Sequence, residues 1–280
     1  MLSNLMIEKH VRAALEEDLG GGHDITSNTL IPEDARAKAA LVARESGVLA
    51  GLMVALSAFS LMSHEFDMIV HAQDGDSLKA GQVIAEIEGP ARALLSAERV
   101  ALNFLTHMSG IASMTSRFVQ EIEDTDTDIC DTRKTLPGLR AFQKYAVSVG
   151  GGSNHRFGLY DAILIKDNHI AVAGSIAAAL DQAKLMAGHT VKIEIEVDTL
   201  GQLKEVLESG KADIVMLDNM NIETLKEAVA LVDGQIVTEA SGGVTQETVR
   251  ALAQTGVNYI SVGALTHSAP SLDIGLDIDA

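Results

Sequence analysis

Residues 191–220 read VKIEIEVDTLGQLKEVLESGKADIVMLDNM and contain a strand pattern, a helix pattern and a second strand pattern in succession. In residues 191–197 apolar and charged side chains alternate, as in a strand whose two faces meet different surroundings. In residues 200–207 leucine and valine recur at helical spacing, and residues 213–219 form a short apolar run. A strand, a helix and a strand of these lengths indicate a βαβ unit with parallel strands.

The same alternation extends over the chain beyond residue 128. It predicts an incomplete β/α barrel over residues 111–267, and a doubly wound sheet is the alternative architecture. The candidate strands are DICDT (128–132), YDAILIK (160–166), VKIEIEV (191–197), DIVMLDN (213–219), QIVTEAS (235–241) and NYISVG (258–263).

The N-terminal part of the chain has a different pattern. Residues 1–19 predict an amphipathic helix that three glycines end, and residues 24–32 (DITSNTLIP) predict a loop. Residues 71–89 predict short β segments between turns, and residues 90–122 a long helix. We therefore expect an N-terminal α/β domain over residues 1–110, on which the tail 268–280 packs.

Composition restricts the classes of partner. The chain has 280 residues, 47% of them hydrophobic, which is ample for a buried core. Its net charge of −18 argues against nucleic acid and anionic membranes as partners. The one cysteine, the absence of a signal-peptide pattern and the absence of a long apolar run predict a cytoplasmic protein without a transmembrane helix.

Charged residues or glycine turns follow the six candidate strands. In a β/α barrel the carboxyl ends of the strands share one face, and active sites are built there. The sequence therefore predicts one site on this face. Its candidate residues are Arg133, Lys134, Lys166, Glu196, Asp218, Ser241, Gly242, Gly243 and Gly263.

Positive charge is concentrated between residues 133 and 166. This segment has six basic residues and one acidic residue, so its local net charge is +5 (6 − 1) in an acidic chain. Arg140 and Lys144 lie one helical turn apart on the predicted helix 138–150, and both are read as surface residues. The other four favour recognition of a carboxylate or phosphate, with His155 as a further donor. They are Arg133, Lys134, Arg156 and Lys166.

Two carboxylates and two glycine turns complete the predicted site. Glu196 and Asp218 offer hard oxygen ligands for Mg²⁺ held together with a phosphorylated substrate. Glu196 is chosen over Glu194 because it is nearer the strand end. The turns EASGGV (239–244) and ISVGAL (260–265) present backbone N–H groups suited to a phosphate. These features predict an enzyme that binds a carboxylate and a phosphorylated compound.

Longer motifs resemble one enzyme family over essentially the whole chain. These are EDLGGGHDITSNTLIP, ARESGVLAG, SAERVALNFLTHMSGIAS, DTRKTLPGLR, GGGSNHRFGLYDAILIKDNHI, IEIEVDTL, MLDNM, EASGGV and ISVGALTHSAPSLDIGLDI. Together they resemble quinolinate phosphoribosyltransferase, the carboxylating nicotinate-nucleotide pyrophosphorylase of NAD biosynthesis. The resemblance implies an N-terminal α/β sandwich joined to an open, incomplete β/α barrel. It also implies a homodimer in which the neighbouring subunit completes each active site.

The resemblance also implies residue roles. The two carboxylates of quinolinate would be bound by Arg133, His155, Arg156 and Lys166, together with Arg99 of the partner subunit. Thr132 would also contact substrate. Glu196 and Asp218 would hold the ribose and Mg²⁺ of phosphoribosyl pyrophosphate. The phosphates would contact Ser241, Gly242, Gly243, Val262, Gly263 and His267. Lys134, Lys166, Glu196 and Asp218 would act in catalysis, with Lys134 serving either the quinolinate or the phosphates.

The implied reaction joins the pyridine nitrogen of quinolinate to ribose C1 as pyrophosphate leaves. Loss of the 2-carboxylate then gives nicotinate mononucleotide and CO₂. Three alternatives remain open. One is a paralogue of the same fold from molybdenum-transport operons. The second is a Schiff-base aldolase that uses Lys166. The third is a carrier module in residues 71–89, whose turns are similar to a biotinyl or lipoyl half-barrel but lack a lysine at the hairpin tip.

Overall fold

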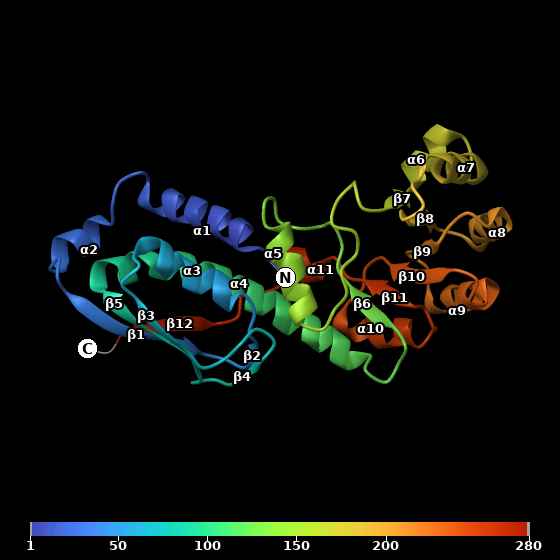
Figure 1. Ribbon diagram of the computed structural model, residues 1–280. Helices are drawn as coiled ribbons and strands as arrows, with labels where there is room; N and C mark the ends of the chain where they lie inside the picture. The colour runs from blue at the N-terminus through green and yellow to red at the C-terminus, as the bar shows by residue number, and fades with distance from the viewer. Residues whose placement is uncertain (1, 279–280) are drawn as a thin grey trace. The chain divides into compact units, whose positions relative to one another are not determined.

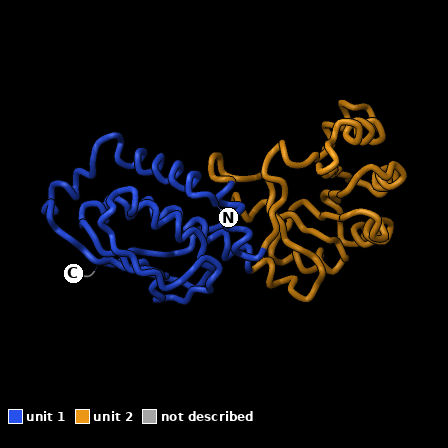
Figure 2. The backbone as a smooth tube through the Cα atoms, viewed as in Figure 1, with its two compact units in different colours: residues 1–116, 141–151, 268–280 blue, residues 117–140, 152–267 orange. Residues whose placement is uncertain are grey.

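The structure is a computed structural model that describes residues 2–278, so residue 1 of the predicted first helix and residues 279–280 of the predicted tail lie outside it. The chain forms two compact units (Figure 2). Unit 1 comprises residues 1–116, 141–151 and 268–280, and unit 2 comprises residues 117–140 and 152–267. Residues 111–116 and 141–151, which we expected in the barrel, group with unit 1.

Unit 1 is built on a four-stranded sheet with the order β12-β1-β5-β3. All three neighbouring pairs are antiparallel, so β12 pairs with β1 although they stand at opposite ends of the chain. β2 and β4 pair with each other and form a second, two-stranded antiparallel sheet. The strands are β1 (Arg36–Ala43), β2 (Gly47–Val48), β3 (Asp67–Val70), β4 (Ser77–Leu78), β5 (Val83–Pro90) and β12 (Ile274–Ile278).

The helices of unit 1 confirm two of the sequence predictions and correct two others. The helices α1 (Asn4–Leu19) and α4 (Ala91–Glu121) confirm the predicted first and long helices, and α3 (Leu52–Met62) lies between them in sequence. The predicted loop 24–32 is wrong, because Asp24 caps the short helix α2 (Ile25–Leu30) by accepting from the Ser27 N–H. Lys144 on α5 (Arg140–Val149) is fully buried, so its assignment to the surface is also wrong.

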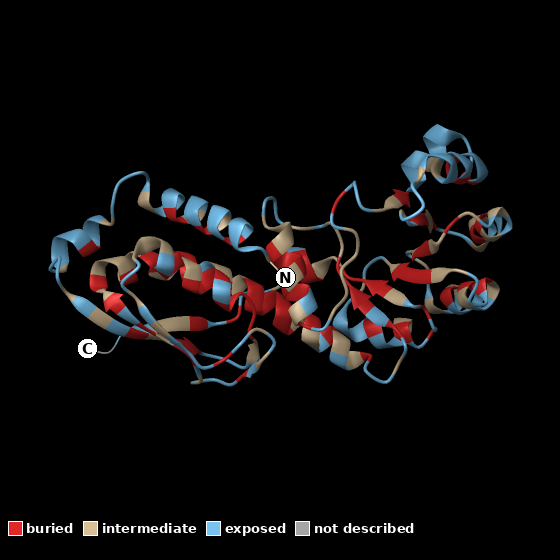
Figure 3. Cartoon of the chain, viewed as in Figure 1, coloured by how far each residue is buried: buried red, intermediate tan, exposed pale blue. Residues whose placement is uncertain are grey.

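The core of unit 1 is aliphatic, as the shortage of aromatic residues requires. Ile84 and Ile87 of β5 and Leu94, Leu105 and Ile111 of α4 are fully buried (Figure 3). Burial of one such side chain contributes about 1.5–3 kcal/mol to the free energy of unfolding.

Unit 2 contains a parallel sheet with the strand order β6-β11-β10-β9-β8-β7. The order has no reversal of the kind that defines a doubly wound sheet, and β6 and β7 remain edge strands within the described chain. The predicted open, incomplete barrel is therefore confirmed. Its strands are β6 (Asp128–Cys130), β7 (Ile163–Ile165), β8 (Ile193–Val197), β9 (Ile214–Asp218), β10 (Val237–Ser241) and β11 (Tyr259–Ser261).

Helices follow the strands of this sheet, and Figure 1 shows α7, α8 and α9 along its outer side. Side-chain caps set where several of them begin: Ser175, Thr199 and Asn221 each accept from the backbone N–H of the third helical residue. No helix of residues 2–278 is long and apolar enough to cross a membrane. The helices are α6 (Asp167–Ala173), α7 (Ile176–Met186), α8 (Leu200–Ser209), α9 (Ile222–Val232), α10 (Gln246–Ala253) and α11 (Ala264–His267).

Candidate active site

A cavity of about 480 Å³ opens at the carboxyl ends of the parallel strands in unit 2. Charged and small polar residues from successive strand ends converge on it, as expected for a β/α barrel. The structure therefore brings together eleven of the predicted site residues. They are Thr132, Arg133, Lys134, His155, Arg156, Lys166, Glu196, Asp218, Ser241, Gly242 and Gly243.

Asp131, at the end of β6, anchors the loop that carries His155 and Arg156. Its fully buried carboxylate accepts from the Asn154 Nδ2 at 2.7 Å and from the His155 backbone N–H at 2.9 Å. The Ser153 N–H donates to Ile129 O at 2.8 Å, so the loop also runs beside β6 through backbone bonding. These bonds fix the direction in which the His155 and Arg156 side chains leave the backbone.

Arg133 and Arg156 form a cationic wall. Burial, followed by the positive charge of Arg133, lowers the pKa of Arg156, whereas Glu194 and Asp161 act in the opposite direction. Arg156 Nη1 donates to Ala162 O at 3.1 Å, but the Nε atoms of both arginines are buried and have no partner within the described chain. Two guanidinium groups that repel each other and keep buried donors unused suit an anion with several oxygens.

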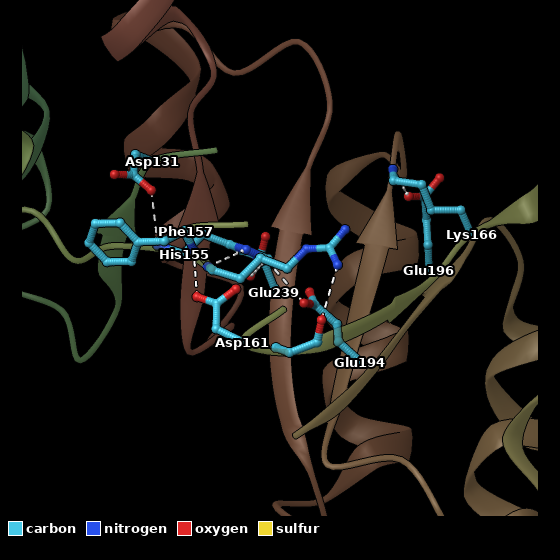
Figure 4. A network of polar contacts seen from close by, with 10 residues as sticks. Asp131, His155, Phe157, Asp161, Lys166, Glu194, Glu196 and Glu239 are labelled. Carbon is cyan, nitrogen blue, oxygen red and sulfur yellow. Dashed lines mark hydrogen bonds and ion pairs between the residues drawn. The ribbon is translucent and has the colours of Figure 1, made fainter. Parts of the chain in front are cut away.

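Asp161 shapes the same loop from its other end. It accepts from the Phe157 N–H at 2.6 Å and the Gly158 N–H at 3.0 Å (Figure 4). Although burial alone would raise it, these hydrogen bonds lower the pKa of Asp161. The ionised carboxylate therefore holds the turn next to Arg156 at neutral pH.

Acidic side chains face this wall across the cavity. Lys166 Nζ donates to Glu196 Oε2 at 2.6 Å, and the two side chains lie at the ends of the neighbouring strands β7 and β8 (Figure 4). Glu196, Asp198 and Asp218 each place one carboxylate oxygen within 4.8 Å of the others. Three hard oxygen ligands in this arrangement fit the preferences of Mg²⁺.

The turn after β10 approaches the turn after β9 closely. Gly242 has φ +104°, and a Cβ built on it would lie 2.1 Å from Asn219 Oδ1 and 3.0 Å from the Asn219 nitrogen. The Asn219 N–H donates to Ser241 O at 2.9 Å, and its side-chain amide donates to Asp218 Oδ2 at 2.5 Å. A glycine at position 242 is thus required both by backbone conformation and by space.

Comparison with known proteins places the chain in one family. A family model described as the quinolinate phosphoribosyl transferase N-terminal domain matches residues 24–109, and one described as its C-terminal domain matches residues 111–277. The chain belongs to the quinolinate phosphoribosyltransferase family.

Several relatives within this family are closely similar. The chain is 49% identical over 277 residues to a probable carboxylating nicotinate-nucleotide pyrophosphorylase of Bacillus subtilis, covering 99% of this chain and 95% of that protein. The crystal structure of NadC from Streptococcus pyogenes superposes with a TM-score of 0.94 at 44% identity, covering 100% of this chain and 99% of that one. The structure of the Francisella tularensis nicotinate-nucleotide pyrophosphorylase superposes with a TM-score of 0.95 at 39% identity, covering 100% of this chain and 98% of that one.

Four residues that the quinolinate phosphoribosyltransferase motifs indicated do not line the cavity. Arg99 belongs to α4 in unit 1, and its side chain is 65% exposed. Gly263 supports the site from behind, because a Cβ there would lie 2.9 Å from Lys134 Cδ and 3.4 Å from His267 Nε2. Val262 is buried next to it. The Lys134 side chain therefore passes over the turn after β11.

Sequence reasoning missed other residues of this phosphoribosyltransferase site. Asn219 and Glu239 line the cavity, as do Leu164, Met216 and Ser261, and Glu194 meets His155 below it. The signal for Glu239 was present, because it precedes Ser241 by two residues and therefore projects from the same face of β10. Glu194 stands in the same relation to Glu196 on β8.

Proposed function

We propose that this chain transfers the phosphoribosyl group of phosphoribosyl pyrophosphate to the ring nitrogen of quinolinate. Loss of the 2-carboxylate then yields nicotinate mononucleotide, CO₂ and pyrophosphate for NAD biosynthesis. One observation carries the proposal: a single cavity is lined by two arginines with unsatisfied buried donors and by the carboxylates of Glu196 and Asp218. Such a site suits a dianion on one side and a metal-bound sugar phosphate on the other.

In this proposal the cationic wall receives quinolinate. Arg133 and Arg156 offer planar donors for its two carboxylates, with Thr132, His155 and Lys166 as further donors in the lining of the same cavity. The lone pair of the ring nitrogen must point toward ribose C1. Holding both substrates at reacting distance supplies much of the rate enhancement in reactions of this kind.

The phosphoribosyl group takes the opposite part of the cavity. The turn of Ser241, Gly242 and Gly243 offers its backbone N–H groups to the 5′-phosphate. Val262 and Gly263 support this part of the cavity from behind, because the Val262 N–H donates to Cys130 O at 2.9 Å, and His267 lies beside Gly263. Because the Lys134 side chain lies against Gly263, we assign Lys134 to the phosphates rather than to quinolinate. The proposal thus takes one of the two roles that the motif alone left open.

Glu196 and Asp218 would hold the ribose hydroxyls and Mg²⁺, and Asp198 would offer a third carboxylate oxygen to the metal. When bound, Mg²⁺ supplies positive charge that stabilises the leaving pyrophosphate. As the nitrogen lone pair forms the bond to C1, the bond from C1 to the pyrophosphate oxygen breaks, and the carboxylates stabilise the positive charge that develops on the ribose. The bond from ring C2 to its carboxylate then breaks, and the electron pair left at C2 takes up a proton.

The assay that tests this function mixes the purified chain with quinolinate, phosphoribosyl pyrophosphate and MgCl₂. We expect nicotinate mononucleotide, CO₂ and pyrophosphate in equal amounts, and loss of turnover when EDTA exceeds the metal. The molybdenum-operon alternative predicts no product from quinolinate, and that result would overturn the proposal. If nicotinate mononucleotide forms at an unchanged rate in excess EDTA, the proposed role of Mg²⁺ is wrong.

We further propose that the protein is a homodimer in which Arg99 acts in the site of the partner subunit. Its exposed position on α4 in unit 1 is compatible with this role. The single cysteine and acidic composition support a cytoplasmic location as part of the same proposal.

The shared site predicts complementation between two inactive variants. Arg99→Ala and Lys166→Ala, inactive alone, are expected to regain about 25% of wild-type activity when their subunits exchange, because half of the dimers are mixed and each has one intact site. The measurement is turnover after co-refolding of equal amounts. Recovery of no activity from a mixture shown to contain mixed dimers would place Arg99 in its own subunit's site or in none.

A further inference from the structure

A buried polar network lies at the base of the cavity and has no assigned role in the reaction. The His155 side chain reaches Glu194 of β8, with Nε2 3.0 Å from Oε2, and Glu239 of β10, with Nε2 3.7 Å from Oε2 (Figure 4). Glu194 is 3% exposed and Glu239 is 4% exposed. Glu239 lines the cavity, so this network lies next to the cationic wall that we assign to quinolinate.

The hydrogen bonds of His155 fix its tautomer. The Arg156 backbone N–H donates to His155 Nδ1 at 2.8 Å, so Nδ1 presents a lone pair and carries no proton. The ring proton therefore resides on Nε2, which donates it to the nearer carboxylate, Glu194. In this arrangement the imidazole is neutral and supplies only one hydrogen bond to two acids.

Two ionised carboxylates with one neutral donor between them are unfavourable in a buried site. Their facing oxygens and His155 lie within 4.8 Å of one another, and the Oε1 atoms of both acids are buried without a hydrogen-bond partner in the described structure. Like charges this close in a low-dielectric environment cannot both persist, so one acid retains a proton. Since Glu194 accepts from His155, the proton belongs on Glu239.

The groups around Glu239 support this distribution of charge. Asp131 at the end of β6 raises the pKa of Glu239 further, whereas His155 and the Ser261 hydroxyl of β11 lower it. Arg133 and Arg156 line the same cavity as Glu239. Burial, followed by the carboxylate of Glu194, raises the pKa of Glu239 to about 7.

We propose that Glu239 determines anion binding in the quinolinate subsite, because its protonated carboxyl forms the floor under the dicarboxylate while Glu194 positions His155. The inference rests on the proposed function. When Glu239 is neutral, it does not offset the positive charge of the cationic wall, which then attracts the dianion at full strength. When Glu239 ionises, a negative charge appears directly beneath the bound carboxylates, and quinolinate binding weakens as the pH rises.

The test compares KM for quinolinate at pH 6.0 and pH 8.5 in wild type and in Glu239→Gln, whose amide keeps the shape of the protonated acid and cannot ionise. In wild type we expect KM to rise about tenfold over this range, and in Glu239→Gln by less than about twofold. KM for phosphoribosyl pyrophosphate serves as the internal reference and should change equally in both proteins. Glu205→Gln, on the exposed side of α8, is the matched control and should keep the wild-type ratio.

A second measurement does not depend on turnover. Because folding raises the pKa of Glu239 from its ordinary value of 4.5 to about 7, its stabilising contribution is complete below pH 4.5 and is lost as the pH rises through 7. The Tm of wild type relative to Glu239→Gln should therefore fall between pH 5 and pH 8. Absence of nicotinate mononucleotide in wild type would overturn the enzymatic function and leave this Tm comparison standing. An equal KM ratio in both proteins, or a constant Tm difference, would overturn the role of Glu239.

Discussion

Lys166→Ala is expected to lower kcat on the order of 10³-fold, the largest effect of any single substitution in the cavity. Lys166 is the only lysine at the end of β7, and its ammonium lies 2.6 Å from Glu196 Oε2. In the reaction it offers a positive charge between the quinolinate side and the ribose side of the cavity. Its removal leaves Glu196 without that partner and the developing negative charge without a nearby cation.

Lys166→Ala should change the free energy of unfolding only slightly, so its effect on kcat can be told apart from an effect on stability. The Lys166 side chain is 46% exposed and that of Glu196 13%, so water screens the ion pair from one side and its contribution to the free energy of unfolding is about 1 kcal/mol. Lys192→Ala is the matched control, because Lys192 pairs with Asp213 at 3.2 Å at the opposite end of β8. The measurements are kcat from steady-state kinetics and Tm from thermal unfolding, for both variants. A Lys166→Ala enzyme with more than about a tenth of wild-type kcat would contradict the assignment.

Lys166 also separates the phosphoribosyltransferase from a Schiff-base aldolase. An aldolase lysine must attack a carbonyl as a free amine, whereas Lys166 is bound to Glu196 as the donor of a charge-assisted hydrogen bond. Borohydride with a keto acid should therefore leave the mass of the protein unchanged. A stable adduct on Lys166 would favour the aldolase.

Gly242→Ala is expected to lower kcat/KM for phosphoribosyl pyrophosphate about 100-fold, because small displacements of binding groups have effects of this size. An alanine at φ +104° is strained, and its Cβ would collide with Asn219. Relief of that collision moves the turn after β9, which carries Asp218, and the amides of residues 241–243. Both halves of the proposed sugar-phosphate site are displaced together.

Gly234→Ala separates strain from collision. Gly234 has φ +70° in the turn before β10, and a Cβ there meets no atom within 4 Å. Its alanine variant should lose about 1 kcal/mol of stability with unchanged kinetics. The measurements are urea unfolding and initial rates at several phosphoribosyl pyrophosphate concentrations. If Gly242→Ala behaves like Gly234→Ala, the close approach to Asn219 has no part in binding.

Much of the architecture could be predicted because hydrophobic periodicity reports burial directly. The alternation in VKIEIEV placed Ile193 and Ile195 on the packed side of β8, and both are buried. The failures come from interactions between distant residues. Nothing local to α5 indicates that Lys144 is buried, and α2 forms because Asp24 caps it, although its six residues are too short for a periodic signal.

The site was predictable only where residues stand at strand ends. Glu196 and Asp218 could be placed on one face because parallel strands share their carboxyl edge. The network of His155, Glu194 and Glu239 joins a loop to two strands that are not adjacent, so it depends on how the sheet curves. The residue pattern of a single strand does not report the curvature of the sheet. Glu239 could therefore be interpreted only as part of a turn motif.

The pairing of β12 with β1 has a consequence for synthesis of the chain on the ribosome. Residues 274–278 are made after all of unit 2, yet they cover one edge of a strand made before residue 44. Until then β1 is itself an edge strand, with unpaired backbone groups that invite association with other chains. Every segment of unit 2 is translated during that interval. The nascent protein therefore depends on rapid release or on a chaperone to protect β1, and tags or truncations at the C-terminus are expected to reduce yield before they affect turnover.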